Sequence, residues 1–321
     1  MASSEADDVL DERAGDRRAN DREADDRRAS DPRRARRLRR RAAARGGMPA
    51  DWRPKVIALD IDGTLLKWVE GTGATSEVMT EAVKEAVRRA YDAGAHIVLA
   101  SGRSPHGMTR VADLLDLPRD GEDRLWIVAS NGAVIVRYPP LDVVHEELFD
   151  AGPAVRAIMA DQPSALVAVE ERGVGYRLND HFPPGELSGE MTLVDVEELV
   201  KEPVSRVIIR NPAASAEEFM EMGRRIGLQG ISYVVGWTAW LDLTPIGVSK
   251  ASGLSYVVDQ LGLEPSDVLA IGDGRNDLEM FAWAGRSVAM GQSIPEVLEA
   301  ADAVTLSVEE DGAAVEISRW F

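Results

Sequence analysis

The chain has 321 residues, no cysteine and a net charge of −18. The lack of cysteine excludes disulfides, thiolate zinc sites and thiol catalysis. No apolar run approaches the roughly 20 residues that a membrane helix needs. The length allows two domains with a sizeable core, and we expect a cytoplasmic protein without a membrane-spanning segment.

Charge is distributed unevenly along the chain. Residues 1–47 hold 14 arginines and 11 acidic residues, and the remainder carries 23 basic and 44 acidic residues. Aspartate recurs every five residues from Asp11 to Asp31, a spacing that advances a helix by about 500° and builds no apolar stripe. We therefore predict a disordered low-complexity tail over residues 1–47.

The end of this tail, residues 33–45, contains eight arginines and no acidic residue. It could be a basic arm for nucleic acid or another anion. We favour the simpler alternatives, a solvated tail or a stretch upstream of a true start at Met48. The acidic remainder of the chain is unsuited to nucleic acid, so any such contact would be made through the tail.

From Lys55 onward, short apolar runs alternate with helical patterns. Helical spacing, ended by glycine or proline, predicts helices at 76–94, 104–118 and 248–265. The alternation of strands and helices predicts an α/β fold with a parallel sheet covered on both faces. Buried strands are predicted at 55–61, 96–101, 125–130, 267–273 and 287–290.

Residues 141–243 have a different pattern, with Pro/Gly-rich interruptions and strand candidates that favour antiparallel hairpins. Helices are expected near 155–160 and 216–226. We predict an inserted α+β domain over 141–243, between core segments 48–140 and 244–321. Three aromatic residues of its last hairpin could pack together or stack on a substrate: Tyr233, Trp237 and Trp240.

Two aspartates, Asp60 and Asp62, end the first predicted strand. Side chains two residues apart on a strand point to the same face, and open α/β sheets bind ligands at the carboxyl ends of their strands. Gly63 permits a tight turn and a close approach of the backbone. Two carboxylates about 4 Å apart repel, so this arrangement requires compensating positive charge.

Three later segments place polar residues at strand ends or helix starts in the same way. ASGR offers a hydroxyl and backbone amides that could hold phosphate, GVSK offers a lysine, and GDGRND offers carboxylates and an amide. Taken singly, each could be a helix cap, a turn or a surface lysine. The residues concerned are Ser101, Gly102, Lys250, Asp273, Asn276 and Asp277.

In this order, DIDGT, ASGR, Lys250 and GDGRND resemble the four motifs of the haloacid dehalogenase superfamily. ASNGAVI (129–135) and the C-terminal segment from Asn276 resemble its Cof-like branch, which carries a large α+β cap. One departure is Gln292-Ser293, where that branch usually has Asn-Ala. The resemblance covers about residues 55–321 and implies a Rossmann-like core with an inserted cap domain.

The resemblance also implies roles for the acidic residues. Asp60 would be the nucleophile that forms an aspartyl-phosphate, and Asp62 the general acid and base. Mg²⁺ would be held by Asp60, Asp273 and the backbone carbonyl of Asp62, with Asp277 beside it. Lys250 would place a fixed positive charge near the nucleophile.

Phosphate oxygens would be bound by Ser101, Gly102, Lys250 and Asn276. The resulting hypothesis is a Mg²⁺-dependent phosphatase of small phosphorylated metabolites, with sugar phosphates as the first substrate class. Alternatives are a phosphomutase or phosphotransferase of the same superfamily, and a non-catalytic phospho-acceptor protein.

Overall fold

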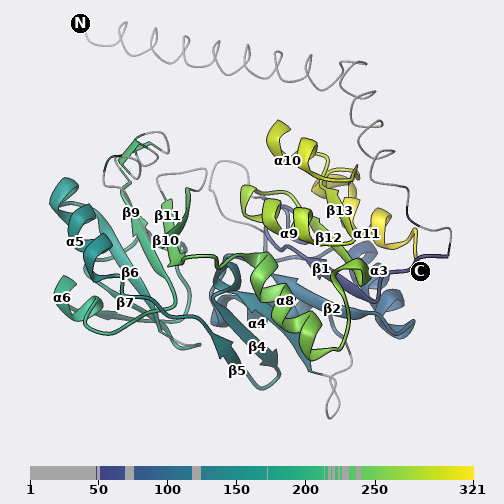
Figure 1. The fold of residues 1–321 in the computed structure, drawn as a ribbon, viewed down its shortest axis with the longest axis horizontal. Helices are drawn as coiled ribbons and strands as arrows, with labels where there is room; N and C mark the ends of the chain where they lie inside the picture. Colours follow the sequence, from purple (N-terminus) through teal and green to yellow (C-terminus); the bar gives the residue numbers. More distant parts are fainter. Residues whose placement is uncertain are drawn as a thin grey trace, which may run out of the picture. The chain divides into compact units, whose positions relative to one another are not determined.

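The five apolar runs predicted as buried strands all lie in one eight-stranded sheet in the computed structural model of the chain (Figure 1). The order is β14-β13-β12-β1-β2-β3-β4-β5. Strands from β14 to β3 pair in parallel, whereas β3–β4 and β4–β5 are antiparallel. The strands are β1 (Val56–Leu59), β2 (His96–Ala100), β3 (Leu125–Ala129), β4 (Val134–Tyr138), β5 (Asp142–Glu146), β12 (Val268–Gly272), β13 (Arg286–Ala289) and β14 (Ala303–Val304).

The described part of the chain begins after the tail. The tail, most of the predicted helix 216–226, and the side chains of Tyr233 and Trp237 lie outside it. Among the described residues, no helix is long and apolar enough to cross a membrane. The structure describes residues 48, 51–68, 76–117, 124–171, 173–212, 214–215, 218, 221–222, 225, 231–235 and 240–321.

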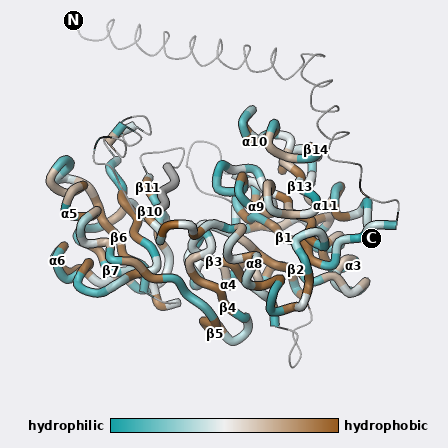
Figure 2. Tube along the Cα trace, in the orientation of Figure 1, coloured by the Kyte–Doolittle hydropathy of each residue, from teal (hydrophilic) through white to brown (hydrophobic). Residues whose placement is uncertain are grey.

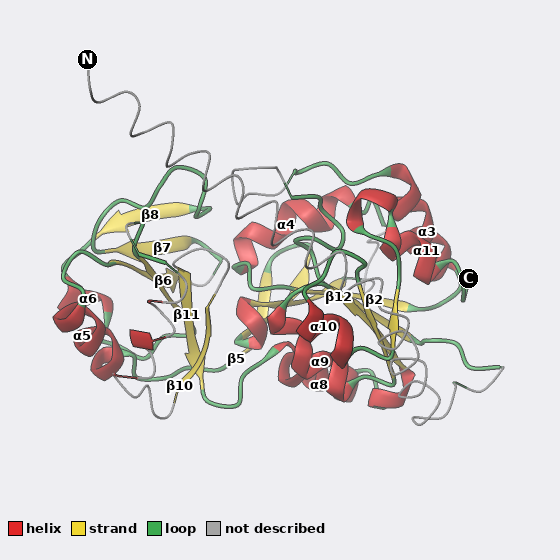
Figure 3. Cartoon of the chain, turned by 90° about the horizontal axis from the view of Figure 1, so that it is seen from above, coloured by secondary structure: helices red, strands yellow, loops and turns green. Residues whose placement is uncertain are grey.

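Helices cover both faces of the first sheet (Figure 3). One core packs β-strand residues against α3, α4 and α11, and another packs the opposite face against α8, α9 and α10. Figure 2 shows apolar residues along the strands, as expected for strands buried on both faces. The helices are α3 (Glu81–Asp92), α4 (Pro105–Leu114), α8 (Lys250–Gln260), α9 (Leu278–Trp283), α10 (Pro295–Ala300) and α11 (Gly312–Ile317), with 3₁₀ turns η1 (Ser130–Gly132), η2 (Pro265–Asp267), η3 (Arg275–Asp277) and η4 (Val308–Glu310).

The predicted helices begin where capping side chains satisfy free backbone N–H groups. Ser104 accepts a hydrogen bond from the backbone N of Gly107 and starts α4, and Pro105 follows at the first helical position. Ser249 forms a capping box with Ser252 and starts α8 at Lys250. These caps fix the position of each helix start relative to the strand ends.

A second sheet, of six strands, has the order β10-β11-β9-β6-β7-β8 and is antiparallel except between β7 and β8. Helices α5 and α6 pack against one of its faces (Figure 3). β5, although inside the predicted insertion, pairs with the first sheet; the domain boundaries stay a prediction. The elements are α5 (Gly152–Asp161), β6 (Leu166–Glu171), β7 (Gly175–Leu178), β8 (Glu190–Leu193), α6 (Val196–Leu199), β9 (Val207–Arg210), β10 (Ile231–Val235) and β11 (Trp240–Pro245).

Side chains alternate between the two faces of this second sheet. Val167, Val169 and Ile209 join the core beneath the two helices. The opposite face carries a smaller apolar cluster that includes Tyr176 and Leu178. Because side chains alternate along a strand, the polar residues on this opposite face point away from the helices.

Candidate active site

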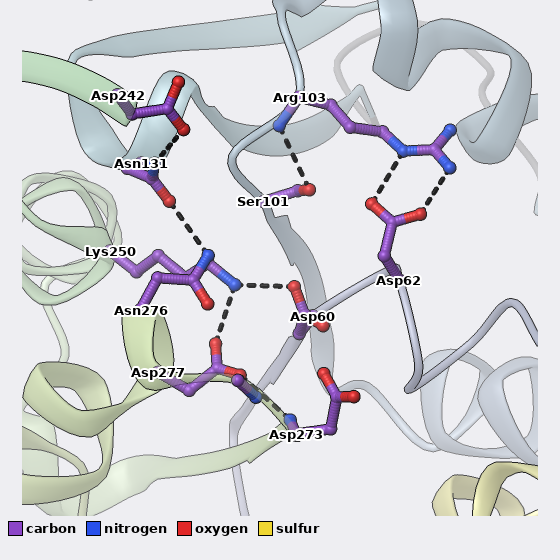
Figure 4. Close-up of polar contacts among 11 residues, drawn as sticks. Asp60, Asp62, Ser101, Arg103, Asn131, Asp242, Lys250, Asp273, Asn276 and Asp277 are labelled. Atoms are coloured by element: carbon purple, nitrogen blue, oxygen red, sulfur yellow. Dashed lines mark hydrogen bonds and ion pairs between the residues drawn. The ribbon is translucent and has the colours of Figure 1, made fainter. Parts of the chain in front are cut away.

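The carboxyl ends of three neighbouring strands bring the predicted site residues together. Asp60 follows β1, Ser101 follows β2 and Asp273 follows β12. Since β1 lies between β2 and β12 in the parallel part of the sheet, these three residues leave adjacent strand ends. Lys250 enters the same place as the first residue of α8 (Figure 4).

Lys250 is fully buried and bridges two carboxylates. Its Nζ lies 2.5 Å from Oδ1 of Asp60 and 2.6 Å from Oδ1 of Asp277. Burial alone would lower the pKa of Lys250, but the charges of Asp277 and Asp60 hold that pKa above its ordinary value. The lysine is therefore a permanent cation, because its two partners outweigh its desolvation.

Asp277 organises the loop that follows β12. Its Oδ2 accepts hydrogen bonds of 2.9 Å from the backbone N of both Asp273 and Gly274. Ligand oxygens of Asp60, Asp273 and Asp277 all lie within 4.8 Å of one another. We call these three residues the acidic cluster.

The acidic cluster holds more negative charge than Lys250 can neutralise. Burial raises the pKa of Asp60 well above its ordinary value, Lys250 offsets part of this rise, and the neighbouring carboxylates add to it. Burial and Asp277 likewise raise the pKa of Asp273 to about 7. Three carboxylates around one lysine leave two excess negative charges when all are ionised, and oxygen donors this close suit a divalent hard cation. The donor set fits Mg²⁺.

A close contact explains the glycine after Asp62. Gly63 has φ of +82°, and a Cβ at this position would lie 2.0 Å from Oδ2 of Asp273. Gln292, which departs from the branch pattern, donates through Nε2 to the Gly63 carbonyl at 2.6 Å and lies 3.5 Å from Oδ2 of Asp273. No role was expected at this position from the sequence, but Gln292 touches the acidic cluster.

The side chain of Asp62 turns toward a different partner. Nε and Nη2 of Arg103 donate to its two carboxylate oxygens at 2.9 and 2.5 Å (Figure 4). Arg103 is the last residue of the ASGR motif, and its part in the site was not foreseen. This two-pronged contact fixes the direction of the carboxylate. The role of the Asp62 backbone carbonyl as a metal ligand stays a prediction.

The predicted phosphate side of the site contains an unforeseen asparagine. Asn276 donates through Nδ2 to Oδ1 of Asn131 at 3.0 Å. The backbone N of Asn131 donates to the Ser101 carbonyl, also at 3.0 Å. A Cβ at Gly102 would lie 3.2 Å from the Asn131 amide. Asn131, in the ASNGAVI segment, therefore contacts the residues predicted to hold phosphate.

Three buried charged residues, Glu170, Arg206 and Asp242, form a cluster in the second sheet that reaches this asparagine through Asp242. We call them the charged triad. Asp242 Oδ2 lies 3.4 Å from Nδ2 of Asn131. Trp240, one of the predicted aromatics, donates through its indole N–H to Oδ1 of Asp242 at 3.1 Å. No sequence motif marked the triad, because its members come from three separate strands or strand ends.

The chain is similar to known proteins over nearly its whole described length. The family described as haloacid dehalogenase-like hydrolase matches residues 57–317. The 5-amino-6-(5-phospho-D-ribitylamino)uracil phosphatase YitU of Bacillus subtilis (strain 168) is 27% identical over 288 residues, which cover 84% of this chain and 98% of YitU.

Two solved structures from Bacteroides thetaiotaomicron share the fold. A phosphatase of the haloalkanoate superfamily superposes with a TM-score of 0.67 at 26% identity, covering 86% of this chain and 98% of the other. A haloacid dehalogenase-like hydrolase gives a TM-score of 0.68 at 28% identity, covering 84% and 100%.

Proposed function

The chain belongs to the haloacid dehalogenase-like hydrolases and is a phosphatase, and we propose that it hydrolyses phosphate monoesters of small polyhydroxylated metabolites, with Mg²⁺ as cofactor and through an aspartyl-phosphate. The family and fold expected from the motifs are thereby confirmed. The observation that carries the proposal is the buried Lys250 between Asp60 and Asp277, beside Asp273.

In the first proposed step, a carboxylate oxygen of Asp60 attacks phosphorus. The bond from phosphorus to the ester oxygen breaks as the bond to Asp60 forms, and Asp62, which enters this step in its protonated form, donates its proton to the departing oxygen. Lys250 keeps positive charge beside the nucleophile throughout. In the structure Arg103 pairs with both oxygens of the Asp62 carboxylate, so Asp62 has to leave this contact and take up a proton before it acts as the acid.

In the second step, Asp62 removes a proton from water, and the resulting nucleophile attacks the aspartyl-phosphate. Inorganic phosphate leaves and the Asp60 carboxylate is regenerated. The phosphate oxygens are proposed to be bound by the Ser101 hydroxyl, the backbone N–H of Gly102, the Lys250 ammonium and the Asn276 amide. Such fixed donors stabilise charge that grows in the transition state.

The cofactor proposal is supported by charge. Asp60, Asp273 and Asp277, with the Asp62 backbone carbonyl, would hold Mg²⁺. When bound, the ion would neutralise the excess charge of the acidic cluster and polarise the phosphoryl group. The cytoplasmic location stays a prediction.

The substrate proposal is supported by relatives. YitU and YcsE of B. subtilis are named as 5-amino-6-(5-phospho-D-ribitylamino)uracil phosphatases, and the phosphate of that compound is carried on a polyol chain. Sugar phosphates have leaving groups of the same chemistry, with many hydroxyls and no second charge. A phosphomutase remains the alternative, because it would use the same nucleophile. A non-catalytic phospho-acceptor is disfavoured by the phosphatases among the relatives.

A phosphate-release screen tests the proposal. Purified protein is incubated with sugar phosphates, polyol phosphates, nucleotides and p-nitrophenyl phosphate, each with Mg²⁺ and with EDTA. We expect release that requires Mg²⁺ and is fastest with a sugar or polyol phosphate. Equal rates in EDTA would contradict the cofactor proposal. Transfer that requires a sugar bisphosphate would instead identify a phosphomutase.

A further inference from the structure

The segment between β3 and β4 has an unusual backbone. Ser130 and Asn131 have φ of 52° and 53°, and Gly132 follows with φ of 99°. Left-handed conformations are unfavourable for most non-glycine residues, although asparagine adopts them more readily than serine, and such segments persist where surrounding contacts determine them. At Gly132 a Cβ would lie 2.0 Å from the Ser249 carbonyl, just before Lys250. The segment is therefore pressed against the start of α8.

The other side of this segment is tied to the predicted phosphate loop. The backbone N of Ser130 donates to the Arg103 carbonyl at 2.8 Å, and that of Asn131 donates to the Ser101 carbonyl at 3.0 Å. The strained turn thus directs two consecutive side chains while its backbone is held by the ASGR loop. This placement points to a role for those two side chains.

The Asn131 side chain has a defined orientation because its oxygen contacts a hydrogen-bond donor and its nitrogen contacts an acceptor. Its Oδ1 accepts from Nδ2 of Asn276 at 3.0 Å, and its Nδ2 faces Oδ2 of Asp242 at 3.4 Å (Figure 4). A flipped amide would place oxygen against a carboxylate and N–H against N–H. One end therefore contacts the predicted phosphate site and the other contacts the second sheet.

Ser130 makes a parallel connection to the same sheet. Its Oγ lies 2.8 and 2.7 Å from the two carboxylate oxygens of Glu170, whose side chain is only 1% exposed. Burial raises the pKa of Glu170, and Arg206 offsets part of this rise. A buried carboxylate needs hydrogen-bond donors, and Ser130 supplies one from the first sheet.

Arg206 lies between the two carboxylates of the charged triad and pairs with both. Its Nε and Nη2 donate to Oδ1 of Asp242 at 3.0 and 2.7 Å, and its Nη1 lies 3.6 Å from Glu170. The side chain is 4% exposed. Two carboxylates around one guanidinium leave one excess negative charge, so neutral donors from Ser130 and Asn131 complete the hydrogen bonding of the triad.

We propose that Asn131 is a positioning residue whose amide joins Asn276, beside the bound phosphate, to Asp242 of the second sheet. Through this contact the inserted domain is held over the site, and we call the Asn131–Asp242 contact the dock. Ser130 reinforces the dock through Glu170. The inference rests on the proposed function where it places phosphate beside Asn276. The Asn131–Asp242 contact itself does not depend on that placement.

A charge-swap series tests the dock. Asn131→Asp is nearly isosteric and keeps an oxygen toward Asn276, but it sets a carboxylate against Asp242. In Asp242→Asn alone, the new amide oxygen has to accept from Arg206, which leaves the new amide N–H₂ facing the N–H₂ of Asn131, so that two donors oppose each other. The double variant restores a donor–acceptor pair with unchanged net charge. Hydrolysis of p-nitrophenyl phosphate with Mg²⁺ gives kcat and KM for each.

Asn179→Asp is the matched control. The Asn179 amide also bridges two groups, accepting from the backbone N of Val167 at 2.7 Å and donating to the Ala165 carbonyl at 3.0 Å, but all three residues lie in the insertion. We expect this variant to lower the thermal midpoint without lowering kcat/KM. Its behaviour separates general destabilisation from loss of the dock.

We expect each single variant to lower kcat/KM by about 10- to 100-fold and the double variant to recover most of the loss, because contacting residues couple. Additive losses in the double variant, or wild-type kinetics in Asn131→Asp, would overturn the proposal. Wild-type protein that hydrolyses nothing would refute the proposed function instead.

Amide hydrogen exchange tests the proposal independently of catalytic activity. We expect Asn131→Asp to speed exchange in the two connections between the sheets, residues 147–151 and 246–249, by about tenfold, as expected when a domain opens more often. The double variant should return to wild-type rates, and Asn179→Asp should leave these connections unchanged. Unchanged exchange in Asn131→Asp would overturn the dock regardless of activity.

Discussion

The acidic cluster and the charged triad both bury carboxylates around a single cation, yet they are balanced differently. Around Lys250, three carboxylates leave two excess negative charges, and carboxyl pKa values rise accordingly. Around Arg206, two carboxylates leave one, and a serine, an asparagine and a tryptophan donate to them. The hydrogen bonding of the triad is nearly satisfied by the protein itself, whereas the acidic cluster keeps excess negative charge that the proposed Mg²⁺ would neutralise.

This difference distinguishes a candidate ligand-binding site, the acidic cluster, from a structural charge cluster, the charged triad. Buried charge without compensation destabilises a fold, so a chain that retains it does so where a ligand supplies the missing charge. A cluster satisfied by the protein itself holds elements in position. Variants that break one cluster while the other stays intact as a reference test this distinction.

Asp60→Asn should have the largest effect. The amide cannot form the aspartyl-phosphate, so we expect kcat with the best substrate of the screen to fall by about 10⁴-fold or more. Circular dichroism and the thermal midpoint should show a folded protein. Asp92→Asn, at the exposed end of α3, should retain wild-type kcat. Substantial turnover by Asp60→Asn would remove Asp60 as the nucleophile.

Lys250→Met should cost about 3–5 kcal/mol of unfolding free energy, because it leaves buried carboxylates without their cation. Urea unfolding measures this loss. Arg206→Met should also destabilise the protein. Added Mg²⁺ should restore part of the stability of Lys250→Met but none of that lost in Arg206→Met. Equal recovery in both variants would mean that Mg²⁺ does not act at the acidic cluster.

Asp273→Ala should weaken Mg²⁺ binding by about 100-fold, since loss of a ligand should cost at least as much as loss of a residue that supports one. Isothermal titration calorimetry on the substrate-free protein gives the affinity. Asp242→Asn, which alters the charged triad instead, should bind Mg²⁺ as tightly as wild type. Unchanged Mg²⁺ affinity in Asp273→Ala would mean that the metal binds at another site.

A smaller effect is expected from pH in the metal-free protein. The pKa of Asp273 is raised to about 7 in the folded state, so the folded state holds a proton that the unfolded state has lost. Its contribution is present at low pH and disappears as pH rises through about 7. We expect the unfolding free energy in EDTA to fall by about 2 kcal/mol between pH 5 and 8.

Two comparisons check this pH effect. Asp273→Asn should flatten the dependence, because the titrating group is gone. Added Mg²⁺ should stabilise the wild type more at pH 8 than at pH 5, since the ion binds the ionised cluster. A stability that rises from pH 5 to pH 8 in EDTA would contradict the expected sign of the dependence.

The parallel sheet and the acidic cluster could be predicted because their signals are local. Each strand is a short apolar run; Asp60 and Asp273 directly follow a run, and Lys250 begins a capped helix. The carboxyl ends of parallel strands share one edge of the sheet. Order along the chain was therefore enough to expect these side chains in one place.

The charged triad and the contact between Asn131 and Asp242 could not be predicted in this way. Arg206 and Asp242 are 36 residues apart, and Asn131 and Asp242 are 111 apart. Their meeting depends on the register of antiparallel strands and on where the second sheet rests, which no local pattern specifies. The part played by Gln292 was missed for a similar reason, because its contact with Gly63 spans 229 residues.

The sequence by itself determined the α/β core and the family, because apolar periodicity and the four motifs are each encoded within a few consecutive residues. It also predicted that Asp60, Asp273 and Lys250 lie at one edge of the sheet. Only the tertiary structure decided that Arg103 holds Asp62 and that Asn131 faces both sheets. The physical reason is that side-chain pairing across elements depends on packing and register summed over the whole domain.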